Sequence, residues 1–138
     1  MASSHLQWLV IKNDSCFLMK SRNCRKAFSK ESRNLKNMNL YKYNGLIHKR
    51  TVGVTPAADG KGVVLELSKP KVIRRPVKRF YKVTLKKDNR RILKSIYNNM
   101  KGRYHYNLNL CAQKRASAIL KSQKYNSNQF LKKKIIMT

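Results

Sequence analysis

The sequence has 138 residues, of which 33 are lysine or arginine and 5 are aspartate or glutamate, so its formal net charge at neutral pH is +28. Such an excess of one sign opposes compaction and attracts polyanions, which is untypical of a small soluble enzyme that interleaves both signs. At 41% hydrophobic residues the chain is too apolar for a disordered basic tail, and its length suits one domain with one modest core.

The amino-terminal residues predict a short amphipathic helix. Ser4 followed by Gln7 resembles a capping box, and the helix ends near Asn13, with Trp8 expected to anchor it to the core. The segment lacks the basic start of a secretory leader, and no stretch of the chain approaches the roughly 18 apolar residues of a membrane span. We therefore expect a cytosolic or nuclear protein with no membrane partner.

The next part of the chain predicts strands on either side of a loop. Residues 16–20 and 41–54 have strand composition, whereas the polar, basic and aperiodic residues 21–39 predict an exposed loop. Residues 56–62, with the sequence PAADGKG, predict a tight turn, because proline and the Asp-Gly pair suit its dihedral angles. The apolar residues 63–67 follow at once, so this turn closes a β-hairpin.

Two further segments continue the sheet region. Residues 69–78 contain Pro70 and Pro76, which lack the amide hydrogen that a central strand donates, so this segment predicts a basic connector. Residues 80–86 alternate apolar and polar side chains, which predicts a half-buried strand with a cationic outer face.

The last third of the chain changes to a helical period. Asp88 is a candidate N-cap for a helix that ends at Gly102, and a second helix is predicted from about Asn107 to Gln123. Residues 125–138 have no helical pattern and predict a basic tail that is disordered or becomes ordered on RNA. The predicted apolar stripes are Ile92, Leu93, Ile96, Tyr97 and Met100 in the first helix and Leu108, Cys111, Ala112, Ala116, Ile119 and Leu120 in the second.

Together these elements predict an α+β fold. It consists of a short N-terminal helix, a small antiparallel β-sheet and two C-terminal helices. We expect residues 1–124 to form a single domain and residues 125–138 to form the tail.

The sequence lacks the groups of residues that catalysis and metal binding require. Each of the five acidic residues is explained by a helix end, a turn, a strand face or a loop, whereas paired-carboxylate and two-metal mechanisms require acids that converge. Cys16, Cys24 and Cys111 have neither an even count nor the close pairing of a zinc site, which fits a reducing compartment. We therefore expect no catalytic residue, no metal ligand and no cofactor.

The remaining chemistry is electrostatic, because lysine and arginine on helix faces, loops and tail cannot all pair with five acids and must meet solvent or phosphate. Arg115 falls in the apolar stripe of the second helix, where its guanidinium either snorkels to water or binds a phosphate or base. Tyr104, in the basic loop between the helices, is a candidate to stack on an unpaired base. The candidate RNA-binding residues are His48, Lys49, Arg50, Lys61, Arg74, Arg75, Arg90, Lys94, Lys101, Arg103, Tyr104, Lys114, Arg115, Lys121 and Lys124.

Several sequence blocks resemble the eukaryote-specific large-subunit ribosomal protein family numbered twenty-eight: HLQW at 5–8, FL-x-K at 17–20, NLK at 34–36, YNGLIHKRTVGV at 43–54, PAADGKGVV at 56–64 and RASAILKSQK at 115–124. The resemblance implies a non-catalytic α+β constituent of the cytoplasmic ribosome, with nucleolar assembly expected. Its implied partners are ribosomal RNA of the large subunit and neighbouring ribosomal proteins, without a small-molecule substrate.

The resemblance also assigns contact roles within the matching blocks. It implies RNA contacts for His48, Lys49, Arg50, Lys61, Arg115, Lys121 and Lys124, and it suggests that the glycines of GKG at 60–62 bring backbone amides close to phosphates. Two alternatives stay open: a free nucleic-acid chaperone, and a small cationic ribonuclease that would use His5, His48 or His105.

Overall fold

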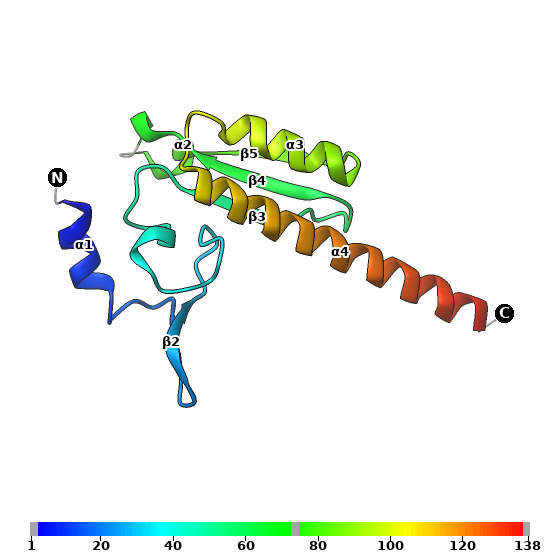
Figure 1. Ribbon diagram of the computed structural model, residues 1–138, viewed down its shortest axis with the longest axis horizontal. Coiled ribbons are helices and arrows are strands. Elements are labelled where there is room, and N and C mark those ends of the chain that lie inside the picture. Colours follow the sequence, from blue (N-terminus) through cyan, green and yellow to red (C-terminus); the bar gives the residue numbers. More distant parts are fainter. Residues whose placement is uncertain (1–2, 73–74, 137–138) are drawn as a thin grey trace. The chain divides into compact units, whose positions relative to one another are not determined.

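The computed structural model describes residues 3–72 and 75–136, and the chain divides into two compact units. One unit comprises residues 1–53 and 66–82, and the other comprises residues 54–65 and 83–138. The predicted α+β class is confirmed (Figure 1). The elements are α1 (Ser4–Ile11), β1 (Leu18–Ser21), β2 (Cys24–Ser29), η1 (Tyr41–Tyr43), β3 (Val52–Pro56), β4 (Val63–Ser68), η2 (Pro70–Val72), α2 (Pro76–Arg79), β5 (Phe80–Leu85), α3 (Asn89–Met100) and α4 (Tyr106–Ile136).

The strands form two small sheets. β1 pairs antiparallel with β2, with Leu18 opposite Ser29 and Met19 opposite Phe28. The other sheet has the order β3-β4-β5, and each of its strands contributes residues to both units. The predicted hairpin is confirmed, because β3 and β4 are neighbours joined by residues 57–62.

Helix α1 differs from its prediction at the cap and in its exposure. The N-cap is Ser3, whose Oγ accepts a hydrogen bond from the Leu6 amide at 3.2 Å. No residue of α1 is buried, and Leu9 and Val10 are 70% and 69% exposed. Trp8 does contact the rest of its unit, where its ring lies edge-on against Tyr41. The helix therefore contacts Tyr41 through its aromatic side chains, while Leu6, Leu9 and Val10 are exposed.

The exposed loop predicted for residues 21–39 was wrong in two respects. Residues 24–29 form β2, and Glu31, Asn34 and Leu35 are buried. The strand was missed because β2 is exposed on both faces along most of its length, so its sequence shows no alternation of apolar and polar residues.

The strand predicted for residues 41–54 was also largely wrong. Residues 41–43 form η1, and the strand begins only at Val52. Between them the Asn44 side chain accepts hydrogen bonds from the amides of Leu46 and Ile47, at 2.9 and 3.2 Å. This local turn competes with an extended backbone in spite of the strand-like composition.

The connector and the strand that follows it agree with the sequence. Residues 70–72 and 76–79 form short helical turns, with Pro76 at the start of α2, where its missing amide hydrogen costs little. In β5, Lys82 and Thr84 are exposed and Leu85 is buried, as the alternation predicted.

In the second unit, α3 confirms the predicted helix. Asp88 occupies the N-cap position, and its carbonyl accepts from the Ile92 amide at 2.9 Å, although its side chain makes no cap hydrogen bond. Ile92, Ile96 and Met100 are fully buried, whereas Tyr97, predicted for the apolar stripe, is 38% exposed. α3 packs against α4 in this unit (Figure 1).

Helix α4 is longer than predicted. Its buried face includes Ala112, Ala116 and Leu120, in agreement with the predicted stripe. The predicted end near Gln123 was wrong, because the helix continues to Ile136. No glycine or proline occurs between these residues, so no strong breaker stops a helix that is already nucleated.

Candidate nucleic-acid interface

A buried carboxylate organises the loop that leads to the first group of predicted RNA-binding residues. Glu31 is 5% exposed, and its Oε1 accepts from the Ser29 hydroxyl at 2.8 Å and from Asn44 Nδ2 at 3.1 Å. Its Oε2 accepts from the Gly45 amide at 2.7 Å. Charge-assisted bonds of this kind are stronger than neutral ones. Glu31 therefore fixes the start of the loop at Asn44 and Gly45. The sequence had explained Glu31 only as a residue of an exposed loop.

The same loop ends in exposed cations on a well-held backbone. The His48 carbonyl accepts from Arg79 Nη2 at 2.9 Å, and the Lys49 carbonyl accepts from the Ser68 hydroxyl at 3.1 Å. The side chains of Lys49 and Arg50 are exposed. The two predicted contact residues Lys49 and Arg50 thus lie on a backbone that is held by hydrogen bonds from Ser68 of β4 and Arg79 of α2.

The His48 ring takes part in an aromatic cluster within the same unit. His48 Nε2 lies 2.7 Å from the Tyr41 carbonyl oxygen, and the two rings meet edge-on with centroids 4.8 Å apart. His5 stacks on Tyr41 at 4.9 Å with an interplanar angle of 12°. The rings of His5 and His48 thus pack on one tyrosine and help to hold this loop.

Further cations of this unit divide between the surface and an ion-pair cluster. Arg75 is exposed at the N-cap of α2, and Arg74 lies outside the described residues. Glu66 is 8% exposed, and its carboxylate lies 3.5 Å from Arg33 Nε and 3.1 Å from Lys82 Nζ. Glu66 is already engaged by two cations, so it does not offset the charge of Arg75. Nor does it offset the charge of His48, Lys49 and Arg50, which we call the Lys49 loop.

Helix α3 carries a stripe of cations with one aromatic residue among them, which we call the α3 stripe: Arg90, Lys94, Tyr97 and Lys101. All four are exposed; spacings of four and three residues place Arg90, Lys94 and Tyr97 on one helix face, and Lys101 follows at the C-cap. The opposite face is the buried one. This geometry confirms the predicted division of α3 into an apolar side and a cationic side.

The connection between α3 and α4 adds two predicted residues. Arg103 is exposed and Tyr104 is half-buried, and both backbone amides donate to the Met100 carbonyl, at 3.2 and 3.1 Å. Gly102 has a φ of +71°, which a tight turn at this point favours. The turn thus places Arg103 directly beyond the end of the α3 stripe.

Helix α4 bears a second cationic face, the α4 stripe: Lys114, Lys121 and Lys124. Lys114 and Lys121 are exposed on the side opposite Ala112 and Ala116, whereas Lys124 is exposed one turn after the buried Leu120, at the edge of the apolar side. The predicted cationic side of α4 thus agrees with Lys114 and Lys121 but not with the position of Lys124.

Arg115 lies between these two sides and is half-buried. Its Nε donates to the Val54 carbonyl at 3.0 Å, and burial lowers the pKa of its guanidinium. The aliphatic stem and Nε therefore stabilise this unit by joining α4 to β3. An additional contact of Arg115 with RNA remains a prediction.

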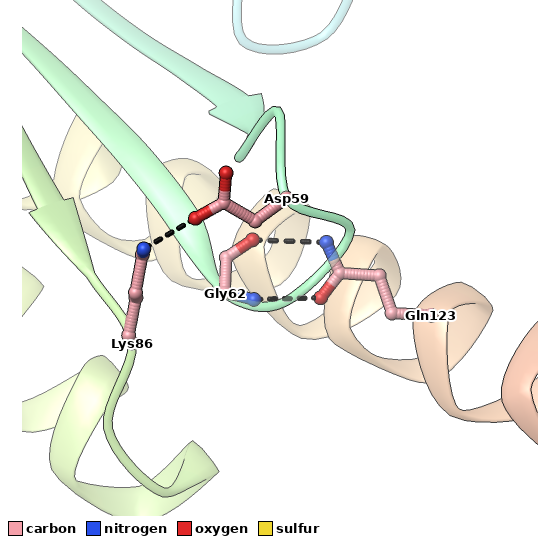
Figure 2. Close-up of polar contacts among 4 residues, drawn as sticks. All are labelled: Asp59, Gly62, Lys86 and Gln123. Carbon is pink, nitrogen blue, oxygen red and sulfur yellow. Dashed lines mark hydrogen bonds and ion pairs between the residues drawn. The ribbon is translucent and has the colours of Figure 1, made fainter.

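The turn of the β3–β4 hairpin is held by protein groups (Figure 2). Gln123 Oε1 accepts from the Gly62 amide at 3.0 Å, and Gln123 Nε2 donates to the Gly62 carbonyl at 2.9 Å. The Gly60 amide donates to the Ala57 carbonyl. The expected approach of these two amides to phosphate was therefore wrong, while the side chain of Lys61 is exposed in the same turn. Nothing in the sequence pattern distinguishes Gln123 from an ordinary polar residue on a helix.

Among residues 3–72 and 75–136, no group of three or more histidine, cysteine or acidic side chains is arranged to hold a metal ion. Within the same part of the chain, no helix combines the length and the apolar character needed to cross a bilayer. Most of the predicted residues that the structure describes share exposed positive charge, presented by the Lys49 loop in one unit and by the α3 and α4 stripes in the other, whereas His48, Tyr104 and Arg115 are half-buried.

Comparisons with known proteins find a matching family model and similar relatives over most of the chain. A family model described as the Ribosomal L28e protein family matches residues 6–122. The large ribosomal subunit protein eL28 of Caenorhabditis elegans is 40% identical over 121 residues, which cover 88% of this chain and 90% of that protein. The protein of the same name from Schizosaccharomyces pombe is 32% identical over 126 residues, which cover 88% and 93% of the two chains.

Proposed function

Because the chain belongs to the ribosomal L28e protein family, we propose that it is a structural constituent of the cytoplasmic large ribosomal subunit, where it binds ribosomal RNA and neighbouring ribosomal proteins without catalysing a reaction. Assembly into the subunit would take place in the nucleolus. The residues proposed to contact RNA are those of the Lys49 loop, the α3 stripe and the α4 stripe, together with Lys61, Arg75, Arg103 and Arg115. The carboxyl-terminal part of α4, which the sequence predicted to be a tail, is proposed to contribute further cations.

The observation that carries the RNA part of the proposal is the excess of positive over negative charge in the whole chain. The chain has five carboxylates for 33 cations, and three of the five, Glu31, Asp59 and Glu66, are engaged by other protein groups. Phosphates supply the missing negative charge, and each neutralised phosphate releases counterions. Affinity should therefore fall with log salt, with a slope of about 0.7 to 0.9 for each contact.

A different surface supports the protein part of the proposal. Helix α1 contains no lysine, arginine, aspartate or glutamate, and Leu6 and Leu9 are 54% and 70% exposed. A groove of about 360 Å³ lies beside it, lined in part by Leu6, Val10 and Leu46. Phosphates find no cation there, whereas apolar side chains of a neighbouring ribosomal protein would cover the exposed surface.

Sedimentation of a tagged chain tests the proposal. In eukaryotic cell extracts, the tagged protein should sediment with the large subunit in sucrose gradients and stay with it after a high-salt wash. Release at moderate salt would indicate a loosely bound nucleic-acid chaperone and contradict the proposal. Cleavage of RNA by the purified chain, with turnover lost in His48→Ala, would contradict its non-catalytic part.

A further inference from the structure

The β1–β2 hairpin is exposed to an unusual degree. Every residue from Met19 to Lys26 is exposed, including those on β1, on β2 and in the turn between them. Successive side chains of a strand point to opposite faces, so exposure without alternation means that neither face of this ribbon is covered. Figure 1 shows the hairpin as a two-stranded ribbon whose turn is the end farthest from its own attachment.

The attachment of the hairpin, in contrast, is well defined. The Ser29 amide donates to the Asn37 carbonyl at 2.8 Å, and the Asn39 amide donates to the Ala27 carbonyl at 3.0 Å. The Lys30 amide donates to the Phe17 carbonyl at 2.9 Å. Because a two-stranded hairpin in water is marginal by itself, a ribbon that is held at its base and uncovered beyond it is suited to being covered by a partner.

The charge of the ribbon indicates the partner. Residues 19–26 include four cations, Lys20, Arg22, Arg25 and Lys26, and no acidic residue lies between Asp14 and Glu31. Arg25 and Lys26 are consecutive in β2, so one strand presents positive charge on both faces of the ribbon. A partner that surrounds the ribbon must therefore be negative on both sides, as folded RNA is.

We propose that the β1–β2 hairpin is a second RNA-binding element, which inserts between RNA backbones and contacts phosphates on both faces. None of its four cations is among the residues proposed above to bind RNA, so the hairpin adds a separate contact region. The cross-strand pair of Met19 and Phe28, 45% and 39% exposed, supplies an apolar surface on which a base can pack. This inference rests on the proposed function, because it requires that the chain binds ribosomal RNA.

Salt-dependent binding of the full chain to protein-free large-subunit ribosomal RNA tests the hairpin. The variant carries Lys20→Gln, Arg22→Gln, Arg25→Gln and Lys26→Gln. Loss of four phosphate contacts should lower the slope of log affinity against log salt by about 3. A milder variant with Arg22→Gln and Arg25→Gln should lower it by about 1.5. A matched control removes four other exposed cations of the same unit, through Lys12→Gln, Lys42→Gln, Lys71→Gln and Lys78→Gln.

Hydroxyl-radical footprinting of the same complexes locates the contact. The hairpin variant should lose one block of RNA protection that the control retains, with circular dichroism and melting temperature unchanged in both. Equal losses of slope in variant and control, or an intact footprint, would overturn the inference while leaving the proposed function standing. The inference would also be overturned if the hairpin variant bound RNA normally but failed to enter the large subunit, because the hairpin would then contact a neighbouring protein instead of RNA. If the unmodified chain fails to bind the RNA at all, the proposed function itself falls.

Discussion

The side-chain amide of Gln123 in α4 forms two hydrogen bonds with the backbone of Gly62 (Figure 2). Its Oε1 accepts from the Gly62 amide at 3.0 Å, and its Nε2 donates to the Gly62 carbonyl at 2.9 Å. The paired bonds join the β3–β4 turn to the helix that bears the α4 stripe. Beside them, Lys86 pairs with Asp59 of the same turn. The turn whose glycines were expected to bring amides close to phosphates thus joins the hairpin to α4. Substitutions in it should lower the stability of the fold more than the affinity for RNA.

Substitution of Gly62 tests this joint. Gly62 has a φ of +90°, and a Cβ there would lie 2.3 Å from the Leu85 carbonyl oxygen. Because both the backbone and the contact would be strained, Gly62→Ala should lower the free energy of unfolding by at least about 2 kcal/mol in urea titrations. Gly60→Ala is the control: φ is +70° but its Cβ meets nothing within 4 Å, so the loss should be about 1 kcal/mol. Equal effects would show that close packing at Gly62 is unimportant.

The buried Glu31 carboxylate gives a second prediction. Glu31→Gln replaces one acceptor oxygen with a donor, so Gly45 or the pair of Ser29 and Asn44 loses its partner. The free energy of unfolding should fall by about 1 to 3 kcal/mol. Asp14→Asn, at an exposed position, should change it by no more than about 0.5 kcal/mol. An unaltered denaturation midpoint for Glu31→Gln would exclude an organising role for this carboxylate.

Neutralising the α3 stripe should change the salt dependence of RNA binding. With Arg90→Gln, Lys94→Gln and Lys101→Gln combined, the slope of log affinity against log salt should fall by about 2 to 3, in filter-binding assays with large-subunit ribosomal RNA. The control pairs Lys82→Gln with Lys86→Gln, whose ammonium groups already lie against Glu66 and Asp59. That control should lower the slope by less than about 1. A stripe variant that matches the control would remove α3 from the interface.

The pair of Asp59 and Lys86 predicts a pH effect. The hydrogen bond from Lys86, aided by its positive charge, lowers the pKa of Asp59 below its usual 3.8. Its contribution to stability is therefore present above pH 3.8 and is lost as the pH falls through the lower pKa of the folded state. In carboxyl NMR titrations, Lys86→Gln should raise the pKa of Asp59 toward 3.8. A titration curve that does not move would mean that this pair does not persist in solution.

The uncharged helix α1 should affect assembly rather than RNA affinity. Leu6→Lys with Leu9→Lys places charge on exposed apolar positions, so the fold should tolerate both changes. Incorporation into the large subunit, measured by gradient sedimentation, should fall several-fold, while affinity for protein-free ribosomal RNA stays the same or rises. Normal incorporation would show that no neighbouring protein covers α1.

Local signals were sufficient to predict part of this protein. The apolar positions Ile92, Ile96 and Met100 recur with the helical period, and the turn at residues 56–62 carries proline and glycine where its dihedral angles require them. Such signals involve residues a few positions apart, so they can be recognised in the sequence without the tertiary structure. The predicted strand at residues 16–20 overlaps β1, but its partner β2 was missed, because a strand exposed on both faces shows no alternation.

Composition and short-range periodicity account for the charge of +28, for the helical stripes and therefore for a surface suited to polyanions, because neither property depends on tertiary contacts. The polar side chains that support the fold were identified from their contacts in the folded chain. Glu31 meets Gly45 at a separation of 14 residues, and Arg115 meets Val54 at a separation of 61. A hydrogen bond between groups so far apart leaves no periodic trace, so each of these residues resembles an ordinary polar surface residue until the chain is folded.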